Sequence, residues 1–166
     1  MLAHPFADPT LIHLAAAAAA RLGNEAEARK LWERALRVAP GFVLARENLD
    51  DLKHPVGVRN GPWALSLGNW LPRGYVEELE RLLRPATRQK KGQAVEQAAR
   101  QFLQNHPETN SLVSVLLTRG DPEGRQFALR LARIAETPEM LAALEEFALG
   151  QAGPDTLRIE PAQALA

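Results

Sequence analysis

The chain has 166 residues with 20 basic and 20 acidic side chains, so it carries no overall charge that would draw it to nucleic acid or to an anionic membrane. A hydrophobic share of 46% and a charged share of 24% are typical of globular proteins and exclude wholesale disorder. The chain contains no cysteine, which excludes disulfides, thiolate zinc sites and thiol nucleophiles.

The longest apolar run in the chain covers residues 11–20. It contains His13, it is rich in alanine, and it is too short to span a bilayer. No basic leader precedes it, so the sequence does not predict a signal peptide. These features predict a cytoplasmic protein with no membrane segment.

Residues 9–52 show the helical recurrence of apolar positions three times in succession. The predicted stripes are Leu11, Leu14, Ala15, Ala18 and Leu22; Ala28, Leu31, Trp32, Ala35 and Val38; and Phe42, Ala45, Leu49 and Leu52. The sequence therefore predicts three amphipathic helices, each of which buries one stripe.

Local signals mark the ends of these helices. Asp8 can accept hydrogen bonds from a first helical turn that opens with Pro9. Asn24 repeats this capping pattern before the second helix. Gly23 leaves so little chain between the first two helices that they are expected to form an antiparallel hairpin, and Pro40 ends the second helix.

The helical rhythm breaks between residues 55 and 74, where prolines and glycines prevent any long helix. This connector carries Trp63, Trp70 and Leu71, which is more apolar area than a solvated linker usually has. We expect the connector to pack against the helices on either side of it.

Helical periodicity resumes after the connector. Its apolar positions are Tyr75, Leu79, Leu82 and Leu83; Val95, Ala98, Ala99, Phe102 and Leu103; Leu112, Val115 and Leu116; Phe127, Leu131 and Ile134; and Leu141, Leu144 and Ala148. Asp121 and Thr137 each precede a proline and are expected to cap the helices that follow. Gly150 is a natural C-terminal cap, and a last helix is expected to begin near Pro154.

The segment GNEAEARKLWERALRVAP, residues 23–40, resembles the second half of a tetratricopeptide repeat (TPR). Gly23, Ala28, Trp32, Ala35 and Pro40 stand at that family's turn glycine, two small positions, aromatic position and closing proline. The resemblance is weaker upstream, where the first helix offers alanines in place of the family's bulky residues. It implies two helices held close by small residues, with Trp32 filling the space between repeats.

The phrase GDPEGRQFALRLARI, residues 120–134, resembles a HEAT-type helix pair. Together the two halves are similar to bacterial proteins that join a TPR segment to a HEAT-like segment through a Trp-Leu-Pro connector, here Trp70, Leu71 and Pro72. The resemblance implies an all-α fold, an α-α superhelix in the form of a right-handed solenoid of antiparallel helix pairs. It divides the chain into a TPR-like repeat with a capping helix at residues 1–54, a connector at 55–74 and HEAT-like repeats at 75–166.

No catalytic or metal-binding motif is recognisable. The four histidines are scattered, and the serines lack the G-x-S-x-G pattern of a nucleophile elbow. Adjacent acids such as Asp50 and Asp51 point to different sides of a helix and are interpreted as solvated. The sequence therefore predicts a protein that is not an enzyme and that binds no metal or cofactor.

Three features are candidate sites for a partner. The basic run at residues 81–91 contains Arg81, Arg84, Arg88, Lys90 and Lys91 with no acid among them, and a solvated loop is the alternative interpretation. The aromatic set Trp63, Trp70 and Tyr75 is either core between segments or an exposed surface for docking peptides. The TPR resemblance implies a groove lined by the first helix of the repeat, at Thr10, His13, Ala17, Ala20 and Arg21.

These observations favour a non-enzymatic scaffold or adaptor that binds a protein or peptide. A nucleic-acid-associated protein using the basic segment 81–91 is the less favoured alternative. One TPR-like unit cannot cover its own apolar faces, so we expect at least one end to be covered by the connector, by a second copy of the chain or by further sequence.

Overall fold

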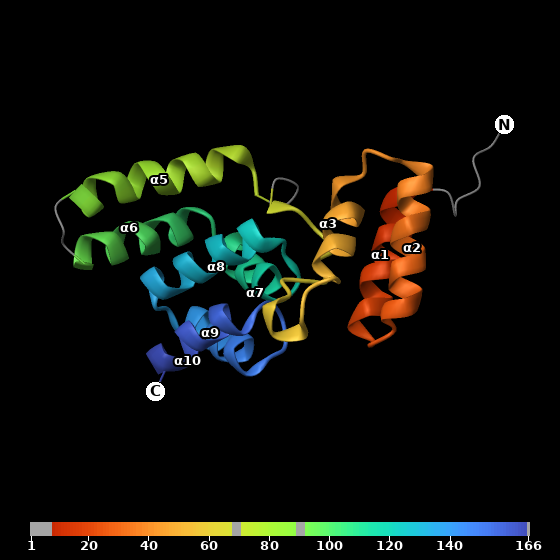
Figure 1. Ribbon diagram of the computed structural model, residues 1–166. Helices are drawn as coiled ribbons and strands as arrows, with labels where there is room; N and C mark the ends of the chain where they lie inside the picture. The colour runs from red at the N-terminus through yellow and green to blue at the C-terminus, as the bar shows by residue number, and fades with distance from the viewer. Residues whose placement is uncertain (1–7, 68–70, 89–91, 166) are drawn as a thin grey trace.

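Helices make up the architecture of the chain (Figure 1). The structure, a computed structural model, describes residues 8–67, 71–88 and 92–165. Its α-helices are α1 Pro9–Arg21, α2 Glu25–Val38, α3 Val43–Asp51, α5 Arg73–Arg88, α6 Gly92–Asn105, α7 Glu108–Arg119, α8 Pro122–Ala135, α9 Pro138–Leu149 and α10 Asp155–Leu165. A short 3-10 helix, η2 Val56–Val58, lies in the connector. The described residues form no strand, and the expected all-α fold class is confirmed.

Side chains cap the helices where the sequence predicts. Asp8 accepts a hydrogen bond of 2.7 Å from the first turn of α1, and Asn24 accepts one of 3.2 Å at the start of α2. Asp121 and Thr137 do the same at α8 and α9, at 2.7 and 3.4 Å. Each cap satisfies an amide that has no partner within its own helix. The chain therefore sets these four helix starts by local chemistry.

The first three helices share one apolar core. α1 and α2 form the expected hairpin around Gly23, whose φ of 78° suits a residue without a side chain, and α3 packs on α2. The buried apolar residues of this core are Ile12, Ala16, Ala17, Ala28, Trp32, Ala35 and Ala45. Alanine predominates in it, so the helices can approach closely around the ring of Trp32.

The face of α1 that enters this core differs from the predicted one. Leu22 is 86% exposed and Leu11 is 55% exposed, although both belong to the predicted stripe. Ile12, His13 and Ala16 are buried in their place. The alanine run gives either face of α1 enough apolar area, and the hairpin favours the face whose small residues let α2 come close. The predicted stripe on this helix was wrong.

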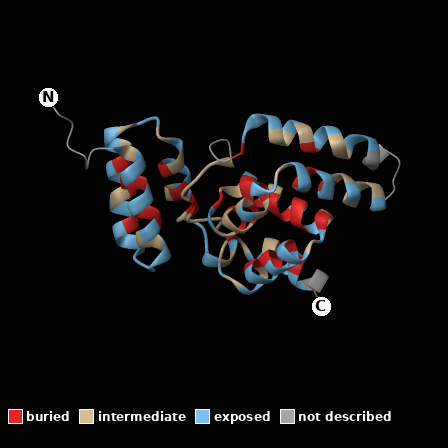
Figure 2. Cartoon of the chain, turned by 180° about the vertical axis from the view of Figure 1, so that it is seen from behind, coloured by how far each residue is buried: buried red, intermediate tan, exposed pale blue. Residues whose placement is uncertain are grey.

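The C-terminal helices form a second core. α7, α8 and α9 pack on one another, α6 packs on α8, and α5 and α10 lie against α6 and α9 respectively (Figure 1). Buried residues gather on α7, α8 and α9, whereas α5 is mostly exposed or half-buried (Figure 2). Leu79 is the buried side chain of α5 among those described. α5 is therefore attached to the molecule largely through α6.

The connector is packed between the two cores, as expected. Trp63 and Leu71 are each only 3% exposed. Its backbone also pairs with the loop before α8: the amide of Ala64 donates to the carbonyl of Arg119 at 3.3 Å, and the carbonyl of Leu65 accepts from Asp121 at 3.1 Å. The connector thus covers one edge of the α1–α3 unit. A regular right-handed solenoid stays a prediction.

Candidate functional site

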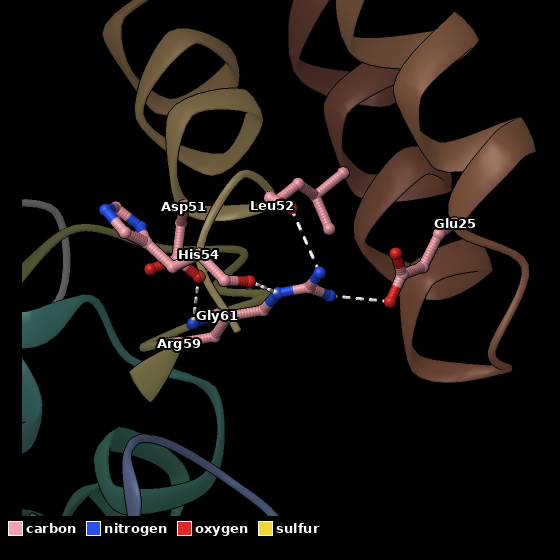
Figure 3. A network of polar contacts seen from close by, with 6 residues as sticks. All are labelled: Glu25, Asp51, Leu52, His54, Arg59 and Gly61. Atoms are coloured by element: carbon pink, nitrogen blue, oxygen red, sulfur yellow. Dashed lines mark hydrogen bonds and ion pairs between the residues drawn. The ribbon is translucent and has the colours of Figure 1, made fainter. Parts of the chain in front are cut away.

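Two buried polar side chains of α3 hold the connector by its backbone. Asn48 accepts from the amide of Trp63 and donates to that residue's carbonyl, both at 3.1 Å. One turn further on, Asp51 accepts from the amide of Asn60 at 2.9 Å. It also accepts from the amide of Gly61 at 2.8 Å (Figure 3). Asp51 was expected to be solvated. It is 7% exposed instead, because the connector folds back over the end of α3.

Arg59 joins the connector to the start of α2 and to the residues that follow α3. Its Nη1 pairs with Glu25 at the start of α2 at 2.6 Å, while its other nitrogens donate to the carbonyls of His54 and Leu52 at 2.6 and 3.0 Å (Figure 3). All three nitrogens of this guanidinium are therefore engaged. We call the contacts of Asn48, Asp51 and Arg59 with the connector the α3 joint.

His13 belongs to the core and not to an exposed peptide groove, which corrects the expectation. Its ring is fully buried and accepts from Trp32 Nε1 on Nδ1 at 3.0 Å. An indole N–H can only donate, so the imidazole is neutral and carries its proton on Nε2. That nitrogen donates to the carbonyl of Ala64 at 3.2 Å. Burial lowers the pKa of His13, and the bond to Ala64 opposes this shift more weakly.

The aromatic set does not form one exposed surface. Trp63 is buried beside Asn48, which agrees with the core alternative for this residue and not with a role in docking. Tyr75 is half-buried, and its hydroxyl donates to the carboxylate of Glu108. The centroid of its ring lies 3.9 Å from the centroid of the His106 ring. These contacts tie α5 to α7. Trp70 lies outside the described residues.

The other expected contact residues are divided among several regions. Arg81 and Arg84 are exposed on α5. Lys90 and Lys91, and the side chain of Arg88, lie outside the described residues, so the basic run is placed only in part. Arg21 extends from the end of α1 and donates from Nη2 to the carbonyls of Pro62 and Thr118, at 3.3 and 3.2 Å.

Arg125 is the central polar residue that sequence reasoning missed. It is 1% exposed on α8 and donates to three backbone carbonyls: Leu117 at 2.9 Å, Asn60 at 2.7 Å and Gly120 at 3.2 Å. Burial lowers its pKa to about 10, helped by the charge of Arg21, while Asp51 and Asp121 oppose the shift. One signal was present in the sequence, because Arg125 stands on the same helical face as Ala128, Leu129 and Ala132.

The second missed feature is an apolar groove between α5 and α8, floored by Ala99 of α6. It has a volume of about 230 Å³ and is lined by the apolar side chains Val76, Leu79, Leu83, Phe127, Leu131 and Ile134. Glu80, Glu123 and Arg130 stand among them. We call it the α5–α8 groove. The sequence shows these residues as stripes but does not show whether facing stripes meet.

Other kinds of site find no support in the part of the chain that the structure describes. No group of three or more histidines and carboxylates is close enough to hold a metal ion there. Within the same ranges, every helix is too short or too polar to cross a bilayer.

Comparison with known proteins gives no relative from which a site could be carried over. No family model, no curated protein and no solved structure matches the chain.

Proposed function

We propose that this chain is a non-enzymatic interaction module that holds an apolar segment of a partner protein in the α5–α8 groove. The observation that carries the proposal is a hollow lined by apolar side chains that remain only half-buried, among them Val76, Leu83 and Phe127. Contiguous apolar surface that stays accessible in a folded protein commonly marks an interaction site.

The size of the groove suits side chains better than a whole cofactor. Its volume of about 230 Å³ lies below the roughly 300 Å³ at which small-molecule pockets begin. Two or three apolar side chains from one face of a helix, spaced at i, i+3 and i+4, would fit such a groove. The proposed occupant is therefore an amphipathic helical segment of another protein.

The charges around the groove indicate what flanks that segment. Glu80 of α5 and Glu123 of α8 outnumber Arg130. Opposite charges across an interface favour the correct partner and its orientation. A lysine or arginine beside the apolar anchors would meet the two glutamates, so the preferred segment is apolar and basic.

Val76 offers a specific test of the groove. It lines the groove but is not packed into the adjoining core cluster, so Val76→Lys should introduce a charge that opposes a basic partner without unfolding the protein. Val43→Lys is the matched control, because Val43 is 56% exposed on α3 and lines none of the described hollows. Circular dichroism would confirm that both variants are folded.

The experiment selects peptides against the wild-type protein from a displayed random library and measures their affinities by fluorescence anisotropy. We expect apolar, basic peptides that bind Val76→Lys at least about tenfold more weakly than wild type, since an ammonium group that faces an apolar and basic segment costs more than about 1.4 kcal/mol. Val43→Lys should bind as the wild type does. Peptides that bind Val76→Lys undiminished, or a selection that yields no saturable binder, would refute the proposal.

A further inference from the structure

A second region of interest lies where α1 meets the connector and the end of α7. One hollow of about 400 Å³ has Arg21, Arg59, Arg125 and Glu25 as its charged lining residues. A neighbouring hollow of about 420 Å³ has Arg21 and Arg119 as its charged lining residues, and its other lining residues are leucines and alanines. Arg21 therefore stands between two hollows whose walls include three further arginines.

Most of the opposite charge in this region is already engaged. Glu25 pairs with Arg59 at 2.6 Å. Asp51 and Asp121 act on Arg125, whose pKa they raise against the effect of burial. Arg59 is thus paired within the fold, and the three nitrogens of Arg125 all donate to backbone carbonyls. Arg21 and Arg119 are the remaining charges to account for.

Neither Arg21 nor Arg119 bonds to a carboxylate of the described residues. Arg21 donates from Nη2 to two backbone carbonyls, which are dipoles and do not cancel a charge. No hydrogen bond or ion pair joins the guanidinium of Arg119 to a residue in the described ranges. Nε and Nη1 of Arg21 and the three nitrogens of Arg119 therefore keep donors for a ligand.

The positive charges in this region repel one another. Partial burial lowers the pKa of Arg21, and the charge of Arg119 lowers it further. The charge of Arg21 in turn lowers the pKa of Arg125, which is buried and lines one of the same hollows. A bound negative group would relieve this repulsion, and the flat fork of a guanidinium fits phosphate and carboxylate oxygens two at a time.

We propose that Arg21 and Arg119 bind an oxyanion, the phosphate or carboxylate group of a small molecule, in the hollows that they line. We call this the Arg21–Arg119 site. It shares no lining residue with the α5–α8 groove and goes beyond the proposed function. A ligand there connects α1 to the end of α7, so its binding stabilises the contact between the two halves of the molecule.

The first experiment measures thermal unfolding of the whole chain in a concentration series of pyrophosphate and, separately, of citrate, with ionic strength held constant by chloride. A ligand that binds the folded state alone raises the midpoint as its concentration rises. A rise with pyrophosphate alone assigns a phosphate group, a rise with citrate alone assigns a carboxylate, and a rise with both supports the shared oxyanion chemistry. No rise with either probe refutes the site.

Variants then locate the binding. Arg119→Gln removes a charge without breaking a described hydrogen bond, so it should fold normally and bind the active probe at least about tenfold more weakly, measured by titration calorimetry. Arg37→Gln on the exposed side of α2 is the matched control and should bind like wild type. Arg21→Lys keeps the charge but loses the fork, and should bind less tightly than wild type. Equal affinity in Arg119→Gln and Arg37→Gln would overturn the assignment.

Discussion

The α3 joint and the α5–α8 groove show two ways of treating the edge of a helical unit. At the joint, buried polar side chains bind the backbone of the connector and hold it over the edge. At the groove, apolar side chains of α5 and α8 face one another across a hollow of about 230 Å³. Hydrogen bonds have direction and fix one geometry, whereas apolar contact is non-directional. The closed edge therefore determines the shape of the molecule, and the open edge remains able to bind.

The largest expected effect comes from removing the aromatic ring at the centre of the α1–α3 core. Trp32→Ala should lower the free energy of unfolding by about 3 to 5 kcal/mol, since Trp32 is fully buried and its loss also leaves His13 without its donor. Urea unfolding followed by circular dichroism measures the change. A loss below about 1 kcal/mol would contradict the packing and the TPR-like role of this residue.

Removing the guanidinium of Arg125 should have the next largest effect. Arg125→Met keeps much of the side-chain volume but leaves three carbonyls, two buried and one partly buried, without this donor, at a cost of about 3 kcal/mol. Arg130→Met, five residues further along α8 and exposed, is the matched control and should change stability by less than about 0.5 kcal/mol. Equal effects in the two variants would show that the buried contacts contribute little.

Acid should lower the stability of the α1–α3 core through His13. The pKa of His13 is lowered in the folded chain from its ordinary value of 6.5, so below that pH the unfolded chain binds the proton more readily. The contribution of neutral His13 to the free energy of unfolding is therefore fully present above pH 6.5. It falls as the pH drops below that value, until the folded ring is also protonated. Unfolding curves at several pH values should show this fall in wild type and a smaller one in His13→Gln. If the free energy of unfolding falls equally with pH in both proteins, His13 is excluded as the cause.

The smallest effect is expected from the basic run at residues 81–91. Reversing the charges of Arg84, Arg88, Lys90 and Lys91 to glutamate should leave the free energy of unfolding within about 0.5 kcal/mol of wild type. Arg84 is exposed, the sequence predicts that the other three are solvated too, and solvated charges contribute little to stability. The same variant tests the nucleic-acid alternative: duplex binding that falls steeply with salt and is lost on reversal would support it. Loss of helical circular dichroism would show instead that these residues are structural.

The parts of the fold that could be predicted are those that depend on neighbours in sequence. Asp8, Asn24, Asp121 and Thr137 cap their helices because a cap needs only the next few amides. The packed connector was also predictable, since Trp63 had to be covered somewhere. These signals act over a short range and leave few alternatives.

The candidate sites could not be predicted because they depend on contacts distant in sequence. The TPR resemblance implied an exposed groove at His13, and the alanine-rich helix gave no contrary signal because its two faces have similar character. The side chain is in fact buried. Its burial is decided by Trp32 and by the carbonyl of Ala64, 51 positions away. Arg125 likewise donates a hydrogen bond to the carbonyl of Asn60, 65 positions away. A pattern within one helix gives no information about which distant backbone atoms it will meet.

The contacts of Arg125 have a consequence for how this sequence can diverge. Its partners are carbonyls of Asn60, Leu117 and Gly120, and every amino acid has a carbonyl, so substitutions at exposed connector positions can accumulate without loss of the contact. Some glycine positions are exceptions, because a Cβ there would meet another atom. A Cβ on Gly120 would lie 2.6 Å from the carbonyl oxygen of Leu116, and one on Gly61 would lie 3.0 Å from a carboxylate oxygen of Asp51. Among homologues we therefore expect Arg125, Gly61 and Gly120 to persist while the connector around them varies.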